Sequence, residues 1–148
     1  MSFSEDVYFA REVDGTFSPI VVLSGETAIP VTVTVIPMEI SEALGQSVGS
    51  LRVTSKHGLI KLACLMYSSS CYSSYFTIHF AGDDDFNATT VEVTFDGANS
   101  TLSVDIEIQD DFLAEGTEAF SIRLGLPSGP NADRISTGLN QSVVFIED

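Results

Sequence analysis

The sequence predicts an all-β fold, an antiparallel seven-stranded β-sandwich, from two features of its hydrophobic pattern. Short runs in which apolar and polar residues alternate recur along the chain, and turn residues such as Gly, Asp and Pro separate them. No stretch has the pattern of a helix of useful length. With 148 residues and 44% hydrophobic content, the chain is long enough for one domain with a real core.

Three strands are expected in the first part of the chain. Val7–Arg11 is the first, and Gly15 supplies the permissive backbone for the turn that follows it. Phe17–Ser24 is the second, and Pro19 must lie at an edge or a bulge because proline cannot donate to a ladder. Val31–Val35 is the third, and its strict alternation places the valines inward and the threonines toward solvent.

Four more strands are expected after residue 89, with their apolar side chains in the core. These strands are Thr90–Phe95, Thr101–Gln109, a run from Phe120 to Leu126, and Gln141–Ile146. The dipeptide Asp96-Gly97 is typical of a hairpin turn between the first two. The inward set of the second and third strands is Leu102, Val104, Ile106, Ile108, Phe120, Ile122, Leu124 and Leu126.

An acidic turn interrupts this pattern between Ile106 and Phe120. It holds four carboxylates within nine positions and no lysine or arginine, namely Asp110, Asp111, Glu115 and Glu118. Like charges this close repel unless a cation lies between them. The turn is therefore either solvated charge that discourages edge-to-edge strand pairing or a site for calcium, whose preferred ligands are clustered carboxylate oxygens. Because Glu118 stands close to the inward Phe120, we expect it to be structural.

The net charge of −15 makes nucleic acid and anionic membrane surfaces unsuitable partners, because both need a basic face. The first residues lack the basic start and apolar core of a signal peptide, and no apolar run approaches the ~20 residues of a membrane span. Three N-x-S/T triplets, which begin at Asn87, Asn99 and Asn140, instead indicate a secreted protein. We therefore expect a part of a longer extracellular or membrane-associated protein, with no direct membrane insertion by this chain.

Several motifs follow one another in the order of a known family. They are P-V-T-V-T-V at 30–35, G-D-D-D-F at 82–86, V-T-F-D-G at 93–97, I-E-I-Q-D-D-F-L-A-E-G-T-E-A-F-S-I-R-L at 106–124 and V-V-F-I-E-D at 143–148. Together they resemble the Calx-β domain, an immunoglobulin-like repeat of sodium/calcium exchangers, integrin β4, adhesion receptors, basement-membrane proteins and sponge aggregation factors. The resemblance implies a single Calx-β-like domain over residues 1–148.

The resemblance also implies calcium ligands in loops at one end of the sandwich. Carried over motif by motif, the ligand positions are Glu12, Asp85, Asp110, Asp111, Glu115, Glu147 and Asp148. Seven carboxylates suggest two or more neighbouring ions that share ligands. Two positions depart from the family pattern: the third acidic position of the turn is Phe112, and the last strand runs into Glu147-Asp148 rather than two or three aspartates.

Residues 46–81 do not fit the resemblance. They contain no acid but hold three of the six basic residues, both histidines and both cysteines, so they carry +3 while the rest carries −18. Either they are translated intron sequence, which transcript sequencing would reveal, or they form a genuine insertion with strands at Gly58–Tyr67 and Tyr75–Phe80. Cys64 and Cys71 could pair in a secreted protein or remain free thiols.

No enzyme motif is found in the chain, which lacks a G-x-S-x-G elbow, a phosphate-binding glycine loop and H-E-x-x-H. Two functional classes therefore remain. One is a calcium-binding module in cell adhesion, matrix assembly or cell communication, with neighbouring repeats or other domains of its parent protein as partners. The other is a structural repeat of a tandem array that binds no metal.

Overall fold

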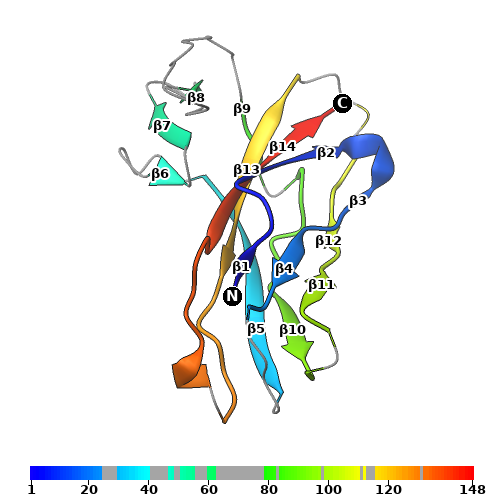
Figure 1. The fold of residues 1–148 in the computed structure, drawn as a ribbon. Helices are drawn as coiled ribbons and strands as arrows, with labels where there is room; N and C mark the ends of the chain where they lie inside the picture. The colour runs from blue at the N-terminus through cyan, green and yellow to red at the C-terminus, as the bar shows by residue number, and fades with distance from the viewer. Residues whose placement is uncertain are drawn as a thin grey trace.

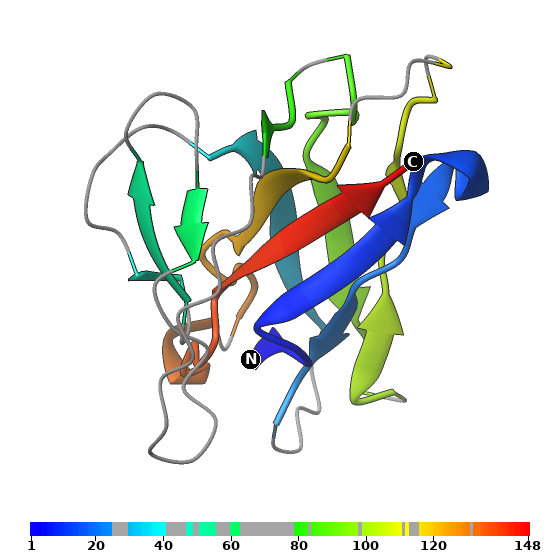
Figure 2. The ribbon, with the colours of Figure 1, turned by 90° about the horizontal axis from the view of Figure 1, so that it is seen from above.

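The computed structural model describes residues 1–24, 30–40, 47–48, 51–55, 60–62, 79–82, 84–97, 99–110, 112, 116–130 and 132–148, with only the backbone described for 47–48, 51–55, 60–62 and 79. This part of the chain forms short β-strands and two 3₁₀ turns, and it contains no α-helix. The strands lie in two facing layers, with a small additional sheet at one side (Figures 1 and 2). The expected β-sandwich is therefore confirmed.

The larger layer is a six-stranded sheet that contains the three longest strands of the described chain. Its order is β10 (Val91–Phe95), β5 (Val31–Glu39), β13 (Glu118–Leu124), β14 (Gln141–Glu147) and β2 (Val7–Arg11), while β9 (His79–Phe80) also pairs with β13. Most pairings are antiparallel, as expected, but β2 runs parallel to β14 and β9 runs parallel to β13. The parallel β2–β14 pair brings the ends of two distant strands to the same edge.

The second layer consists of shorter pieces. One sheet contains β1 (Ser2–Phe3), β4 (Ile20–Val22) and β11 (Thr101–Ser103), and a second contains β3 (Thr16–Phe17) and β12 (Ile106–Glu107). The expected strand Phe17–Ser24 is thus broken at Pro19, whose carbonyl accepts a hydrogen bond from the N–H of Val104 at 3.0 Å. The 3₁₀ turn η1 (Glu12–Asp14) joins the two layers, and η2 (Ala132–Arg134) precedes β14.

Two expectations about the connections were wrong. The Asp96-Gly97 turn does not close a hairpin, because β10 pairs with β5 while β11 pairs with β4, so this turn crosses from one layer to the other. Leu126 is 89% exposed rather than inward. The strand ends at Leu124, where the N–H of Gly125 donates to the carbonyl of Thr34 at 2.8 Å and the chain bends away.

The core between the layers follows the predicted alternation. Val31, Val33 and Val35 are at most 1% exposed, and the threonines between them are only partly buried. From the other layer, Val104, Ile106 and Ile108 are buried against them. Phe86 stacks on Phe120 with ring centroids 4.2 Å apart, which fixes the segment after residue 84 onto β13.

A separate three-stranded sheet occupies the region that departs from the family pattern. It consists of β6 (Ser47–Val48), β7 (Leu51–Ser55) and β8 (Ile60–Leu62), and it stands beside the upper part of β13 and β14 (Figures 1 and 2). β8 and β9 fall within the two strand ranges expected for an insertion, but β8 pairs with β7 rather than with the second range. Cys64 and Cys71 lie outside the described residues.

Candidate calcium-binding site

The carboxylates singled out from the sequence converge on one end of the sandwich, which we call the acidic end. It is the end where β2, β12 and β14 finish and β13 begins, and the chain terminus lies there next to the turn after β2 (Figures 1 and 2). Of the carboxylates singled out, the structure describes Glu12, Asp85, Asp110, Glu118, Glu147 and Asp148. Asp111 and Glu115 lie outside the described residues.

Strand register brings the last residues of the chain next to Glu12. In the parallel β2–β14 pair, Glu147 lies opposite Arg11. The next residues on the two segments, Asp148 and Glu12, therefore lie at the same level. Glu12 begins η1 and is only 6% exposed. The N–H of Gly15 donates to the Glu12 carbonyl at 2.9 Å, and a φ of 66° at Gly15 is a left-handed conformation that glycine adopts without strain. The turn therefore holds Glu12 in a defined position beside the C-terminus.

Asp85 is tied to the strand that leads into the acidic turn. Phe86 forms an antiparallel bridge with Ile108, and the N–H of Gln109 donates to the Asp85 carbonyl at 2.9 Å. The side chain is held as well, because Oδ2 of Asp85 accepts a hydrogen bond from the N–H of Gly82 at 2.6 Å. Asp85 thus lies beside the residue that precedes Asp110.

The same strand is also joined to the turn that carries Glu12. The N–H of Ile108 donates to the carbonyl of Gly15 at 3.1 Å. Because Gly15 closes η1 and Gln109 bonds to Asp85, the strand end at residues 108–109 connects two carboxylate-bearing segments. Segments that are far apart in sequence therefore meet through backbone hydrogen bonds, independently of any metal.

The acidic turn begins with a local hydrogen bond. Oδ1 of Asp110 accepts from the N–H of Phe112 at 2.9 Å, and Phe112 has a φ of 63°, which is unusual for a residue other than glycine. Phe112 is 90% exposed, consistent with its replacement of an acidic position by a side chain that is no ligand. Farther along, the N–H of Gly116 donates to Oδ2 of Asp148 at 3.3 Å. This contact links the acidic turn directly to the end of the chain.

Glu118, which we expected to be structural, is buried at the acidic end. It is the first residue of β13, is 6% exposed and lies opposite Ile146, one residue before Glu147. Residues two positions apart in a strand point to the same face, so Glu118 faces inward with Phe120 and Ile122. Burying a carboxylate is costly unless hydrogen bonds or a cation compensate. Glu12 and Glu118 are therefore two buried carboxylates at one end, and the D-D-x(3)-E-x(2)-E spacing was the signal for the second.

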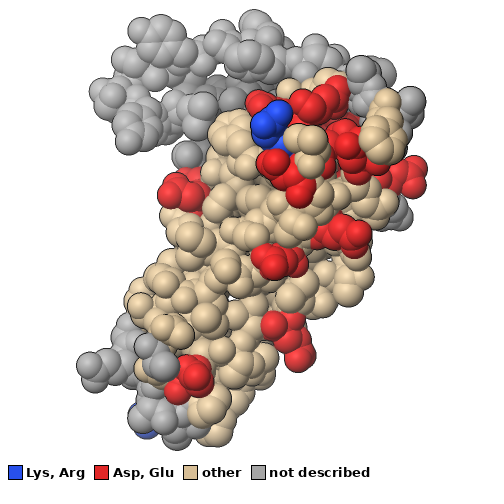
Figure 3. All heavy atoms as spheres, turned by 90° about the vertical axis from the view of Figure 1, so that its right-hand side faces the viewer, with Lys and Arg blue, Asp and Glu red and all other residues tan. Residues whose placement is uncertain are grey.

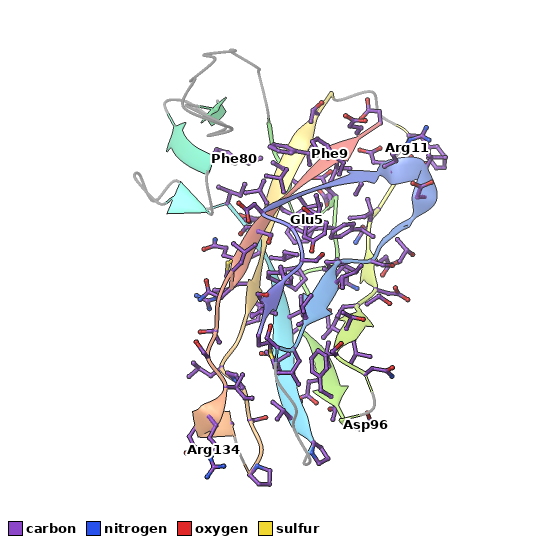
Figure 4. The ribbon with its side chains drawn as sticks, viewed as in Figure 1. Glu5, Phe9, Arg11, Phe80, Asp96 and Arg134 are labelled. Carbon is purple, nitrogen blue, oxygen red and sulfur yellow. The ribbon has the colours of Figure 1, made fainter. Side chains whose placement is uncertain are left out.

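Negative charge is concentrated over this end of the molecular surface. Figure 3 shows Asp and Glu side chains gathered there, with a basic side chain among them, and fewer on the rest of that face. Figure 4 places Arg11 at the acidic end and Arg134 at the opposite end. Because acids outnumber bases there, the crowding produces a negative potential that attracts cations.

The candidate ligands have the right chemistry for calcium, but their side chains are not yet arranged around one ion. Every candidate ligand is a carboxylate oxygen, which suits a hard cation, whereas zinc favours the nitrogen and sulfur of His and Cys. Among the described residues, however, no three His, Cys, Asp or Glu side chains already stand close enough to hold one ion together. A site at this end would therefore have to be completed by side-chain movement and by positions such as Asp111 and Glu115.

Comparisons with known proteins agree with this architecture. Residues 79–148 match the family model of the Calx-beta domain. Among solved structures, the Calx CBD1 domain in its apo form superposes with a TM-score of 0.61 and 20% identity over 99% of this chain and 94% of that chain. The Calx CBD2 domain gives a TM-score of 0.63 and 15% identity over 99% and 85%. Curated protein sequences give no match.

A third structure is larger than this chain. The calcium binding domain CBD12 of CALX1.1 gives a TM-score of 0.64 and 19% identity, covering 99% of this chain and 44% of that chain, so this chain spans less than half of it. At these identities the structural matches establish the fold. Residues 79–148 carry the Calx-beta sequence pattern, and the described chain has the fold of the Calx domains, as the resemblance predicted.

Proposed function

We propose that this domain binds calcium ions through the carboxylates of the acidic end. The observation that carries the proposal is the meeting of four separate segments there. η1 bonds to the strand end at Ile108, Asp85 bonds to Gln109, and Asp148 accepts from Gly116. A set of hydrogen bonds that gathers acidic residues from across the chain suits a cation site better than dispersed surface charge does.

The proposed donors fall into three groups by position. Glu12 and Glu118 are buried and form the floor of the site, while Asp85 is oriented by its bond from Gly82. The remaining donors come from the acidic turn and the end of the chain, namely Asp110, Asp111, Glu115, Glu147 and Asp148. Calcium takes six to eight oxygens in flexible geometry, so this number of carboxylates supports two or more ions that share ligands.

Calcium binding at this end would couple to stability. Without a cation the carboxylates repel one another, and two of them are held in a buried environment. An ion that binds the folded state alone stabilises it by about 2.7 kcal/mol at a hundredfold excess over Kd. If neighbouring domains are arrayed in tandem, the same ions would stiffen the junction at this end.

The proposal extends to the kind of protein that contains this domain. We place the domain in a larger cell-surface, adhesion or extracellular-matrix protein involved in cell communication, in a binding rather than a catalytic role. One of the matched structures, CBD12 of CALX1.1, is named a calcium binding domain, and the N-x-S/T triplets agree with an extracellular setting. No helix in the described part of the chain is long and apolar enough to cross a membrane.

One observation favours the alternative, a structural repeat that binds no metal. The described side chains include no group of three already arranged around a common point. The two functions differ in how stability responds to calcium. A structural repeat melts at the same temperature with calcium and with chelator, whereas a calcium module gains stability.

Thermal melting of the purified chain in excess calcium and in chelator separates the two functions. For a chain of this size, 2.7 kcal/mol corresponds to a Tm increase of about 5–10 °C. Magnesium at the same concentration controls for ionic strength, because it prefers stricter octahedral geometry with retained waters. Equal melting temperatures in calcium and chelator would rule out the calcium function.

A further inference from the structure

The three N-x-S/T triplets of the chain differ in how accessible the fold leaves them. Their asparagines are Asn87, Asn99 and Asn140, of which the first is half-buried and the other two are exposed. A sugar on the asparagine Nδ2 is bulky and hydrated, so a folded domain accommodates it only at a side chain that projects into water. The contacts of each triplet therefore determine which asparagine can carry a glycan.

The side-chain amide of Asn87 is already used within the fold. Its Nδ2 donates to Oε2 of Glu107 at 3.1 Å, and its Oδ1 accepts from the N–H of Thr89 at 2.9 Å. The backbone N–H of Asn87 also donates to the Glu107 carbonyl at 2.9 Å. A sugar on Nδ2 would replace one amide hydrogen and crowd the Glu107 side chain, so a glycan here competes with native contacts.

At Asn140 the asparagine is exposed, but the third residue of the triplet is not. Ser142 is 0% exposed, and its hydroxyl donates to the carbonyl of Glu5 at 2.7 Å. The carbonyl of Asn140 accepts from the N–H of Leu124 at 2.8 Å, which fixes this residue next to β13. The glycosylation motif requires a Ser or Thr hydroxyl at the third position. In the folded chain, that hydroxyl is out of reach of a transferring enzyme.

Of the three triplets, the one at residues 99–101 alone is exposed at every position. It lies between β10 and β11, where the Ser100 carbonyl accepts from the N–H of Leu23 at 2.8 Å. Thr101 is the first residue of β11 and lies opposite Val22 on β4. The fold therefore holds the backbone of this triplet in place while Asn99 and the Thr101 side chain remain accessible.

This turn lies at the end of the molecule opposite the acidic end. Figure 4 shows Asp96, which begins the turn, at the same end as Arg134, whereas Arg11 is at the acidic end. The two strands that the turn joins, β10 and β11, each lie at the edge of their sheet in the described part of the chain. A glycan on this turn would hinder pairing of these edges with another chain and would leave the acidic end open.

We propose that Asn99 is an N-glycosylation site. In the transfer, Nδ2 of Asn99 forms a bond to the anomeric carbon of an oligosaccharide that is carried on a lipid pyrophosphate. The bond from that carbon to the pyrophosphate oxygen breaks, the lipid pyrophosphate leaves with the bonding electrons, and one amide hydrogen leaves as a proton. The inference rests on the extracellular setting proposed above, because the secretory route supplies this donor, and it does not depend on calcium binding.

Cell-free translation of the 148-residue chain behind a secretion signal, with microsomes present, supplies the donor and the transferring enzyme. Glycosidase release in heavy-oxygen water converts each modified asparagine to a labelled aspartate, so mass spectrometry reports the occupancy of every site. Thr101→Ala destroys the motif but keeps Asn99, and Ser100→Ala is the matched control because the motif tolerates alanine at its middle position. Both positions are exposed, so both variants are expected to fold, which circular dichroism verifies.

We expect the occupancy of Asn99 to exceed that of Asn87 and of Asn140. It should be lost in Thr101→Ala and kept in Ser100→Ala. An unmodified Asn99, or an equal or higher occupancy at either of the other two asparagines, overturns the proposal. Calcium titration of the same protein is a separate readout: absence of calcium binding overturns the proposed function alone, and an unmodified Asn99 overturns this inference alone.

Discussion

The backbone N–H of Gly116 donates a hydrogen bond to Oδ2 of Asp148, across 3.3 Å and 32 positions of sequence. Gly116 lies within the acidic turn and has a φ of 90°, and Asp148 directly follows the last residue of β14. A single carboxylate therefore connects the acidic turn to the strand that pairs with β2. Calcium ligands drawn from distant segments require such a connection.

Replacing Asp148 with asparagine tests this connection. Asp148→Asn keeps a side chain of the same shape but removes one negative charge from the acidic end, so calcium affinity falls while the fold persists. We expect Kd to rise about tenfold, equivalent to about 1.4 kcal/mol. Calcium titration of both proteins provides the measurement.

The matched control is Asp133→Asn. Asp133 is exposed in η2 beside Arg134, which Figure 4 places at the opposite end of the molecule. This substitution changes the net charge by the same amount and should leave Kd within a factor of about two, since charges separated by more than about 10 Å are largely screened at 0.1 M salt. An equal loss of affinity in both variants would show a general charge effect instead of a site.

The buried carboxylates Glu12 and Glu118 should give opposite effects with and without calcium. Glu12→Gln and Glu118→Gln each remove one negative charge from the crowded acidic end, so repulsion among the carboxylates falls and melting in chelator shifts upward, by about 3 °C for 1 kcal/mol in a chain of this size. In excess calcium the same variants lose a ligand and gain less stability than the native chain. Melting curves in the two buffers report both effects. If the variants melt lower than the native chain by the same amount in both buffers, these carboxylates act only through structural hydrogen bonds.

A substitution at Gly125 tests the close approach of this residue to Thr34, directly after β13 ends. A Cβ at this position would collide with Oγ1 of Thr34, while the Gly125 N–H bonds to the Thr34 carbonyl. Gly125→Ala should lower the free energy of unfolding by about 1–3 kcal/mol, in the range of overpacking substitutions. Denaturant unfolding measures this loss.

Removal of the colliding oxygen should reverse most of that effect. In Gly125→Ala with Thr34→Ala, the loss should be smaller than the sum of the two single losses by at least about 0.5 kcal/mol, as expected for residues in contact. Additive losses in this double-mutant cycle would contradict the close approach of Gly125 to Thr34.

Removal of the Phe86–Phe120 stack should lower the free energy of unfolding by a larger amount and should also weaken calcium binding. Phe86 is 1% exposed, so Phe86→Ala should destabilise the fold by about 3–5 kcal/mol. Because Phe86 follows Asp85, the variant should also bind calcium more weakly. Phe112→Ala is the control, since Phe112 is 90% exposed and should change stability by no more than about 0.5 kcal/mol. Similar losses for the two variants would contradict the packing described for Phe86.

Much of the fold could be predicted because a period of two residues reports directly which side chains face the core. The alternation at 31–35 placed all three valines correctly, and the run after Phe120 was correct up to Leu124. The pattern does not report which strand pairs with which. The parallel β2–β14 pair and the crossing at Asp96-Gly97 therefore could not be deduced.

The candidate site, like the fold, could be predicted only in part from the sequence. Sequence motifs indicated the segments that carry Glu12, Asp85 and Asp148, but the backbone contacts that join them are tertiary and leave no local signal. Glu118 was expected to be structural because it stands close to the inward Phe120, and the structure buries it at the acidic end; whether it also binds an ion stays a prediction. The run V-V-F-I at 143–146 did carry a missed signal, since unbroken apolar residues indicate a strand covered on both faces.

Isothermal titration of the 148-residue chain with calcium, after chelator has been removed, measures the proposed ion binding itself. We expect saturable binding of more than one ion per chain, weakened by Asp148→Asn and unchanged by Asp133→Asn. Absence of any saturable heat, together with an unchanged Tm in excess calcium, would exclude a calcium site at the acidic end.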